Sequence, residues 1–189
     1  MLAKQLNVPK SKINNAIQSI TLIDNNINYE QINYEGYLPN RVAVIIETLT
    51  DNKNRTVNDI KTTLHKNGGN LGKKGSVLHM FSRVSSIKYK KEDINESALL
   101  NFFINLKIDN YTENNGIVEI ISNKEDHSDI TIKLKKVFGA PLNSTIKWLP
   151  DNIINLNKEE SNITLKFLDE LNNIKDVQSI ISNCSFTTN

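Results

Sequence analysis

Short apolar runs and polar turn residues alternate along the chain between residues 30 and 81. Residues 30–37 (EQINYEGY) and 42–48 (VAVIIET) predict two strands, and the second is a β-branched apolar run typical of a buried strand. Pro39 and Asn40 supply the turn between them. Residues 77–81 (VLHMF) predict a further strand.

A helix is predicted between the second and third of these strands. Its buried stripe consists of residues at helical spacing, namely Val57, Ile60 and Leu64. Thr56 is the expected N-cap, and Asp59 stands three residues on, where its side chain can bond back. Asn67 and Gly68 end the helix, because glycine enters the left-handed region without steric cost.

The middle of the chain repeats this mixture of strands and helices. In order, the pattern predicts a strand at 86–90, a helix opened by Asp93, strands at 108–113 and 117–121, and an element at 124–138. The two adjacent strands form a hairpin around the turn sequence NNG at 114–116. Residues 124–138 fit both strand and helix spacing, and Gly139 and Pro141 beyond them favour the helix.

The last quarter of the chain predicts a strand, a capped helix and a strand. Residues 144–149 form the first strand, and 177–181 the last. Asn157 is the expected N-cap of the helix, with Glu160 in the capping-box position and a buried stripe that includes Phe167.

Taken together, these elements predict an α+β protein with two ferredoxin-like α/β domains, one inserted into the other. The inserted domain is expected at 84–142, where the order is βαββαβ. The outer domain is expected at 27–83 plus 143–189, because these two segments would make a second such sheet by pairing with each other across the insertion.

Charge is distributed unevenly along the chain, although the net charge is only +2. Residues 53–91 hold ten basic residues and one acid, whereas the rest of the chain holds 13 basic and 20 acidic residues. Concentrated positive charge attracts polyanions, so this segment is a candidate nucleic-acid surface. The alternative is a solvated lysine-rich face that is balanced by acids folded against it.

Four of the seven glycines lie within residues 66–77, KNGGNLGKKGSV. A P-loop requires Lys-Ser/Thr after its glycines and a helix that begins there, so that free N–H groups face the phosphate. Here the spacing differs and a helix ends, which presents carbonyl oxygens that repel an anion. We therefore expect a helix-to-strand connection that holds Lys73 and Lys74 at its tip, beside Lys61 and Lys66.

Residues 49–81, LTDNKNRTVNDIKTTLHKNGGNLGKKGSVLHMF, resemble the signature of the YebC family of gene-expression regulators, which includes the mitochondrial translational activator of cytochrome c oxidase. LTDN, NRT, KNGGNLG and GSV occur in the order and spacing of that family. NVPKSKINNAI at 7–17 and LDELNNIKDVQSIISN at 168–183 resemble other family segments more loosely. The resemblance covers nearly the whole chain.

Two features depart from the family pattern. Family members carry a basic helical domain ahead of the segment matched by 7–17, so residues 1–26 are expected to be a short helical remnant of that N-terminal domain. The glycine-rich GYGPGG of the family is GYLPNR at 36–41, where Leu38, Asn40 and Arg41 replace three glycines.

The resemblance implies a non-enzymatic factor that associates with the ribosome or with RNA and supports or activates translation. We assign phosphate contacts to seven cations, because flexible cations position a protein on a nucleic-acid backbone without reading its sequence. These are Lys53, Arg55, Lys61, Lys66, Lys73, Lys74 and Arg83. The matched motif also contains residues expected to shape the helix cap and the loop: Asp51, Asn52, Asn54, Thr56, Gly68, Gly69, Asn70, Leu71, Gly72, Gly75 and Ser76.

Catalysis has little support in the sequence. His65, His79 and His127 lack the spacing of metal ligands, and the single cysteine, Cys184, lies beside an apolar strand as a small core residue would. We therefore expect no catalytic residue, no metal and no cofactor. Aromatic residues are few and are not interleaved with the basic run, which argues against a stacking platform for single strands.

Two other functions remain open. One is a DNA-binding transcriptional regulator, although no helix-turn-helix, zinc-finger or homeodomain pattern is visible. The other is a protein-interaction scaffold with incidental charge. No apolar run is long enough for a signal peptide or a membrane helix, so we expect a cytoplasmic protein without a membrane partner, or alternatively one of the mitochondrial or plastid matrix.

Overall fold

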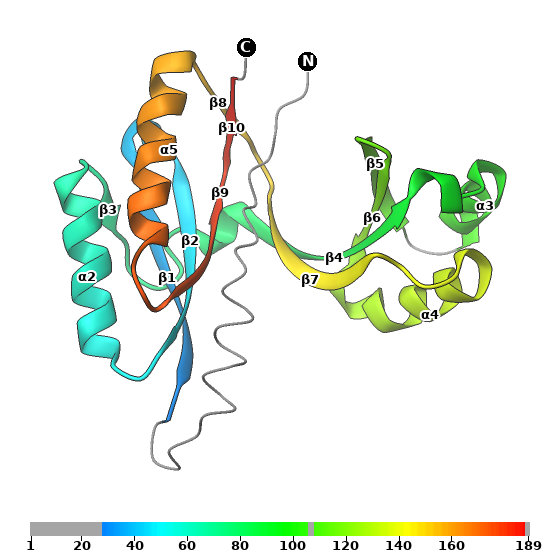
Figure 1. Ribbon diagram of the computed structural model, residues 1–189, viewed down its shortest axis with the longest axis horizontal. Helices are drawn as coiled ribbons and strands as arrows, with labels where there is room; N and C mark the ends of the chain where they lie inside the picture. Colours follow the sequence, from blue (N-terminus) through cyan, green and yellow to red (C-terminus); the bar gives the residue numbers. More distant parts are fainter. Residues whose placement is uncertain (1–27, 106–107, 188–189) are drawn as a thin grey trace. The chain divides into compact units, whose positions relative to one another are not determined.

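The computed structural model describes residues 28–105 and 108–187, which form two compact units (Figure 1). The first unit contains the described residues up to Phe81 together with those from Pro150 onwards, and the second contains 82–149. This confirms the prediction of an α+β chain in which one unit is inserted into the other. The helical remnant expected at 1–26 lies outside the described residues.

The first unit is built on a four-stranded sheet. Its strands, in spatial order, are β3 (Asn70–Leu71), β1 (Glu30–Tyr37), β2 (Ala43–Thr50) and β9 (Val177–Ser182). β1 is antiparallel to both β2 and β3, and β2 is antiparallel to β9. The pairing of β2 with β9 joins the two chain segments that flank the insertion.

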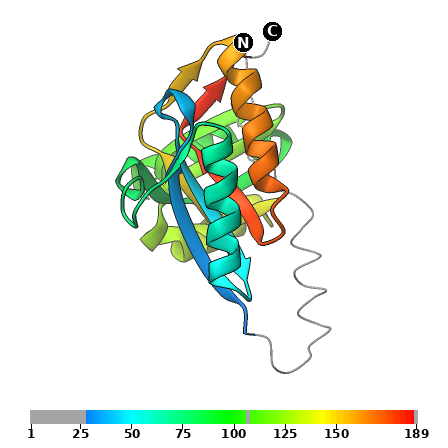
Figure 2. The same ribbon diagram turned by 90° about the vertical axis from the view of Figure 1, so that its left-hand side faces the viewer.

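Two helices, α2 (Lys53–Lys66) and α5 (Lys158–Asn172), lie side by side over one face of this sheet (Figure 2). Apolar residues from the sheet and both helices form one buried core, including Val44, Ile46, Ile60, Leu64, Phe167 and Leu171. Two short strands that the sequence did not predict, β8 (Ile154–Leu156) and β10 (Cys184–Phe186), pair in parallel and add Leu156, Cys184 and Phe186 to this core.

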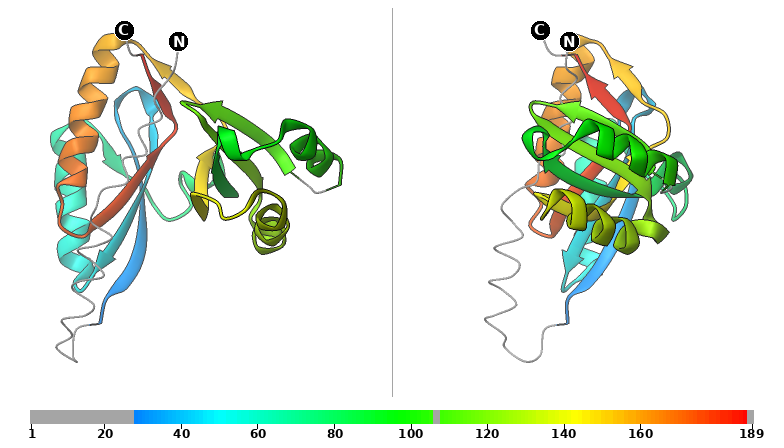
Figure 3. Two further views of the ribbon diagram at one scale, coloured as in Figure 1. Left: turned by 45° about the vertical axis from the view of Figure 1, so that its right-hand side comes forward. Right: turned by 90° about the vertical axis from the view of Figure 1, so that its right-hand side faces the viewer.

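The second unit has the order of a split βαβ fold. Its elements are β4 (Phe81–Lys90), α3 (Glu96–Asn105), β5 (Ile108–Asn114), β6 (Ile117–Asn123), α4 (His127–Phe138) and β7 (Asn143–Pro150). The sheet order β5-β6-β4-β7 places the first and third strands in the centre, as in ferredoxin-like domains. α3 and α4 cover one face of this sheet (Figure 3), and Ile87, Tyr89, Ile120 and Leu134 lie in the core between them.

Three local expectations need correction. Residues 143–149 belong to β7 of the second sheet, whereas the sequence boundary assigned them to the outer domain. Helix α2 begins at Lys53 and is capped by Asn52, whose side chain accepts a hydrogen bond from the Arg55 N–H at 3.1 Å, so Thr56 lies inside the helix. Residues 78–80 form a 3-10 turn before β4, so 77–81 are not a separate strand.

Candidate nucleic-acid interface

The segment KNGGNLGKKGSV begins as the C-terminal cap of α2. Gly68 has a φ of +75°, in the left-handed region that glycine tolerates best, and the Gly69 N–H donates to the Leu64 carbonyl at 2.8 Å. A Cβ on Gly69 would lie 2.7 Å from the Tyr37 carbonyl oxygen and 3.0 Å from the Phe167 ring. These two glycines therefore shape the connection, by ending the helix and allowing it to approach β1 closely.

The chain then folds back on itself between Gly72 and Ser76. The Ser76 N–H donates to the Lys73 carbonyl at 3.0 Å, and Gly75 has a φ of +85°. A Cβ on Gly72 would lie 2.1 Å from the Ser76 hydroxyl oxygen. This tight turn places Lys73 and Lys74 at the tip of the loop.

The backbone N–H groups of this loop converge on the carboxylate of Glu35. Gly75 donates to Oε1 at 2.6 Å, while Val77 and Leu78 donate to Oε2 at 2.8 Å and 3.0 Å. Glu35 is only 3% exposed. Burial alone would raise the pKa of Glu35, but these three N–H groups and the nearby His79 outweigh burial and lower it. The anion held by these N–H groups is thus an internal carboxylate.

The loop reaches the sheet face opposite the helices. Gly36 faces α2, since a Cβ there would lie 3.3 Å from Leu64 Cδ1, and neighbouring residues of a strand point to opposite faces. Glu35 therefore points away from α2. The Tyr37 hydroxyl, on the same side as Glu35, donates to the Ser76 carbonyl at 2.8 Å and fixes the loop at a second point.

The predicted cations fall into different environments. Among the described residues, Lys61, Lys73 and Lys74 form no ion pair, and all three are exposed. Lys53 pairs with Glu30 at 2.6 Å, and Lys66 lies 3.7 Å from Glu170. Arg83 belongs to the second unit, where its guanidinium lies 5.0 Å from the ring centre of Trp148.

The structure does not link the four lysines that the sequence grouped together. Lys61 and Lys66 lie on α2, whereas Lys73 and Lys74 lie on the loop that passes to the opposite face of the sheet. The loop lysines therefore stand as a separate candidate contact.

Arg55 is held by carboxylates. Its guanidinium lies 2.6 Å from Asp51 and 2.8 Å from Asp176. The hydrogen bond to Asp176, and to a smaller extent that to Asp51, raises the pKa of Arg55 above its ordinary value. These two carboxylates compensate the positive charge that the sequence assigned to a phosphate contact.

Asp176 is the centre of a polar cluster that sequence reasoning missed. It is 5% exposed and accepts hydrogen bonds from Thr56 Oγ1 at 2.6 Å and Thr50 Oγ1 at 3.1 Å, in addition to Arg55. Burial raises the pKa of Asp176, and the hydrogen bonds from Thr56, Arg55 and Thr50 outweigh burial and lower it. The available signal was its position inside the family-like segment 168–183, directly before the last long strand.

The segment that replaces the family's glycines keeps a glycine-like backbone. Asn40 and Arg41 both have a φ of +61°, a conformation that residues with a side chain rarely adopt. Leu38 is buried in the core of the first unit at 3% exposure. Residues 38–42 thus form a turn with two left-handed residues, and Leu38 packs in the core.

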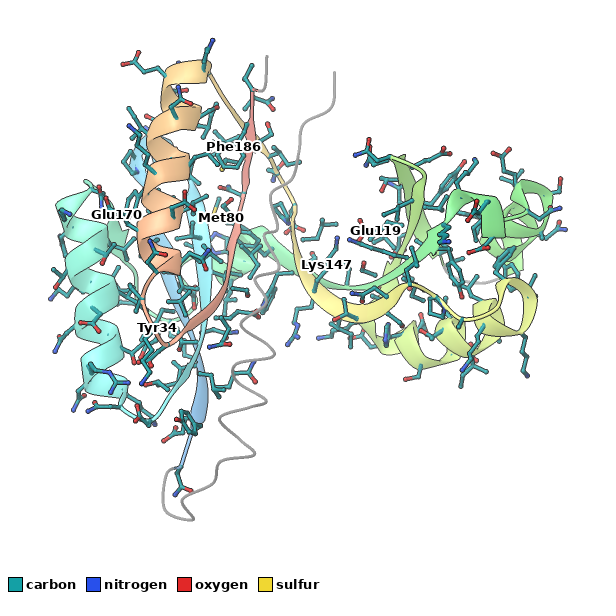
Figure 4. The ribbon with its side chains drawn as sticks, viewed as in Figure 1. Tyr34, Met80, Glu119, Lys147, Glu170 and Phe186 are labelled. Atoms are coloured by element: carbon teal, nitrogen blue, oxygen red, sulfur yellow. The ribbon has the colours of Figure 1, made fainter. Side chains whose placement is uncertain are left out.

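In the second unit, Glu119 of β6 lies between two lysines. Lys147 of β7, which is labelled together with Glu119 in Figure 4, contacts it at 2.6 Å. Lys88 lies 3.9 Å from the same carboxylate. Burial raises the pKa of Glu119, but Lys147 and a hydrogen bond from Ser86 outweigh burial and lower it. Lys88 and Lys147 thus share one carboxylate.

Neither a group of metal ligands nor a membrane-spanning helix is found in the part of the chain that the structure describes. Within 28–105 and 108–187, no three His, Cys, Asp or Glu side chains are grouped to hold a metal ion. No helix in these ranges is long and apolar enough to span a bilayer. Nδ1 of His127 lies 2.8 Å from the hydroxyl of Ser85, which is fully buried.

The chain is similar to known proteins both in sequence and in fold. Residues 29–184 match the sequence model of a family described as TACO1/YebC second and third domain. A probable transcriptional regulatory protein of Pelagibacter ubique is 35% identical over 187 residues, which cover 99% of this chain and 77% of the relative. Another probable transcriptional regulatory protein, from Rickettsia canadensis, is 36% identical over 182 residues, which cover 96% of this chain and 72% of the relative. The fold also matches the crystal structure of a conserved hypothetical protein from Aquifex aeolicus, with a TM-score of 0.74 and 29% sequence identity. The match covers 99% of this chain and 77% of that protein.

Proposed function

Because this chain belongs to the TACO1/YebC family, we propose that it is a non-enzymatic regulator of gene expression that binds RNA, on the ribosome, through the loop that carries Lys73 and Lys74. The family match and the regulatory names of the relatives support the general role. The loop geometry supports the mode of contact.

The observation that carries this proposal is the combination of free lysines and occupied N–H groups in one loop. Glu35 accepts from three N–H groups of the loop, so these groups are not available to an external phosphate. Lys73 and Lys74 are exposed and form no ion pair with any described residue. Contact with a polyanion then falls to two point charges, which bind phosphates irrespective of base sequence.

Binding without catalysis fits the way the buried carboxylates are used. Glu35 and Asp176 each accept at least three hydrogen bonds from their own chain. Carboxylates with lowered pKa values and internal partners serve poorly as general bases, which work best with a pKa near the operating pH. We therefore assign both to structure.

A DNA-binding transcriptional regulator is the second candidate, and the names of the relatives, probable transcriptional regulatory proteins, favour it. Duplex DNA and RNA both present phosphates to the loop. The two candidates differ in the partner that retains the protein at physiological salt.

The experiment combines co-sedimentation with ribosomes and filter binding to labelled single-stranded RNA and duplex DNA, each over a series of salt concentrations. The proposal expects the full chain to sediment with ribosomes and to bind RNA in preference to DNA, with affinity falling as salt rises. Tighter, sequence-selective binding to DNA would favour the transcriptional candidate. Binding to neither would leave a protein-interaction scaffold and contradict the proposal.

A further inference from the structure

We propose that Glu35 is the positioning residue of the Lys73–Lys74 contact: it clamps the loop on both sides of the two lysines, and RNA binding depends on that clamp. This inference rests on the proposed function, since it concerns the same loop. It adds a residue of β1 that carries negative charge and that no charge-based search for an RNA contact would select.

The clamp is made by two different groups of one residue. The Gly72 N–H donates to the backbone carbonyl of Glu35 at 2.8 Å, and the Gly75 N–H donates to its carboxylate at 2.6 Å. Lys73 and Lys74 are the only residues between these two points. Val77 and Leu78 then hold the following turn on the same carboxylate. The path of the lysine backbone is therefore set by Glu35.

A fixed backbone matters for a contact made by lysines. A flexible loop loses conformational freedom when it binds, and that loss opposes association. A clamped loop has already lost most of this freedom on folding, so only the side chains remain to be ordered. Replacing the carboxylate leaves N–H groups of Gly75, Val77 and Leu78 without their acceptors, and the loop then gains stability by opening to water.

The charge of Glu35 and its positioning role predict opposite changes in RNA affinity when its carboxylate is removed. Glu35→Gln raises the net charge by one unit, and simple electrostatics expects a more positive protein to bind RNA more tightly. If Glu35 clamps the loop, E35Q should bind RNA more weakly, because Gln cannot accept three hydrogen bonds with the strength of a carboxylate. The sign of the change therefore separates the two explanations.

The test is a double-mutant cycle on the full chain with a fluorescein-labelled single-stranded RNA as the probe. The clamp predicts that E35Q weakens binding about tenfold, comparable to loss of both lysine contacts in K73Q/K74Q. In E35Q/K73Q/K74Q, the Glu35 change should have little further effect, because residues that act through one contact are not additive. Tighter binding by E35Q, or a full further tenfold loss in the triple variant, would overturn the inference.

A readout without RNA separates this inference from the proposed function. Trypsin cleaves after lysine, so cleavage after Lys73 or Lys74 reports how far the loop opens in the folded protein. We expect faster cleavage at these two sites in E35Q than in Glu47→Gln, a control on the same sheet face whose carboxylate accepts from Ser179 at 2.5 Å. Equal rates of cleavage after Lys73 and Lys74 in the two variants would overturn the positioning role of Glu35, whatever the RNA-binding assay shows. If K73Q/K74Q binds RNA as tightly as the parent while E35Q is cleaved faster, the clamp stands as loop architecture and the proposed function fails.

Glu35→Asp covers the case in which E35Q does not fold. Aspartate keeps the charge and withdraws the carboxylate from the loop by one methylene. The clamp expects E35D to weaken RNA binding and to speed cleavage after Lys73 or Lys74, with no change in net charge. Parent-like behaviour of E35D in both assays would contradict the role of Glu35.

Discussion

The guanidinium of Arg55 donates to both carboxylate oxygens of Asp176, at 2.8 Å and 3.1 Å, across 121 positions of sequence. Arg55 lies in the first turn of α2, and Asp176 directly precedes β9. The hydroxyls of Thr50 and Thr56 complete the cluster. The family-like residues around Arg55 thus fasten β9 to α2, on either side of the inserted unit.

Asp176→Asn should destabilise the first unit. Asparagine removes the charge that pairs with Arg55 and leaves one oxygen to serve three donors, so we expect the free energy of unfolding to fall by about 2 kcal/mol. Urea unfolding followed by circular dichroism measures this loss. Asp169→Asn on the exposed side of α5 is the matched control and should stay within about 0.5 kcal/mol of the parent. Equal stabilities of the two variants would contradict the role of the cluster.

Stability should decline on acidification. The pKa values of Glu35 and Asp176 are lowered in the folded protein, so the unfolded chain binds their protons at a higher pH than the folded chain does. The stabilisation is present in full at neutral pH and is lost as the pH falls below about 4.5, the ordinary value for glutamate, towards the lowered values. Urea unfolding from pH 7 to pH 3 measures the loss. The acid slope should be shallower in E35Q, and an unchanged slope would show that Glu35 does not titrate in this range.

Two adjacent glycines should differ in their tolerance of alanine. Gly69→Ala places a Cβ 2.7 Å from the Tyr37 carbonyl oxygen, a backbone atom that cannot move aside cheaply. Gly68→Ala meets only Pro39 Cγ at 3.8 Å and carries just the cost of a positive φ, about 1 kcal/mol. Thermal unfolding should therefore show a larger loss for G69A than for G68A. The reverse order would indicate that α2 does not approach β1 as closely as described.

The sequence predicted those elements whose determinants are local. The capping box of α5 is present as expected, with Asn157 accepting from the Glu160 N–H at 2.9 Å. The β5–β6 hairpin turns at Asn115 and Gly116, both with positive φ. In such cases neighbouring residues provide the hydrogen bonds, so periodicity and capping rules suffice.

Contacts between residues that are far apart in the chain could not be predicted from the sequence. Thr56 has the chemistry of an N-cap, but its hydroxyl serves Asp176, 120 positions away, and Asn52 caps the helix. Glu35 lies about 40 positions from the N–H groups that it binds, and no local pattern marks a carboxylate for that role. The charge distribution identified the basic segment. Only the contacts in the structure distinguish Arg55, whose charge is paired with carboxylates, from Lys73 and Lys74, which form no ion pair with a described residue.

The salt dependence of RNA binding tests the central claim most directly, by comparing two variants that lose the same charge. K73Q/K74Q removes the loop lysines, and K135Q/K136Q removes two exposed lysines of α4 in the second unit, neither of which forms an ion pair with a described residue. A plot of log affinity against log salt concentration should flatten by roughly one unit per lost phosphate contact in K73Q/K74Q and stay near the parent slope in K135Q/K136Q. Equal slopes in the two variants would contradict the claim, because the loop lysines would then contribute only through net charge.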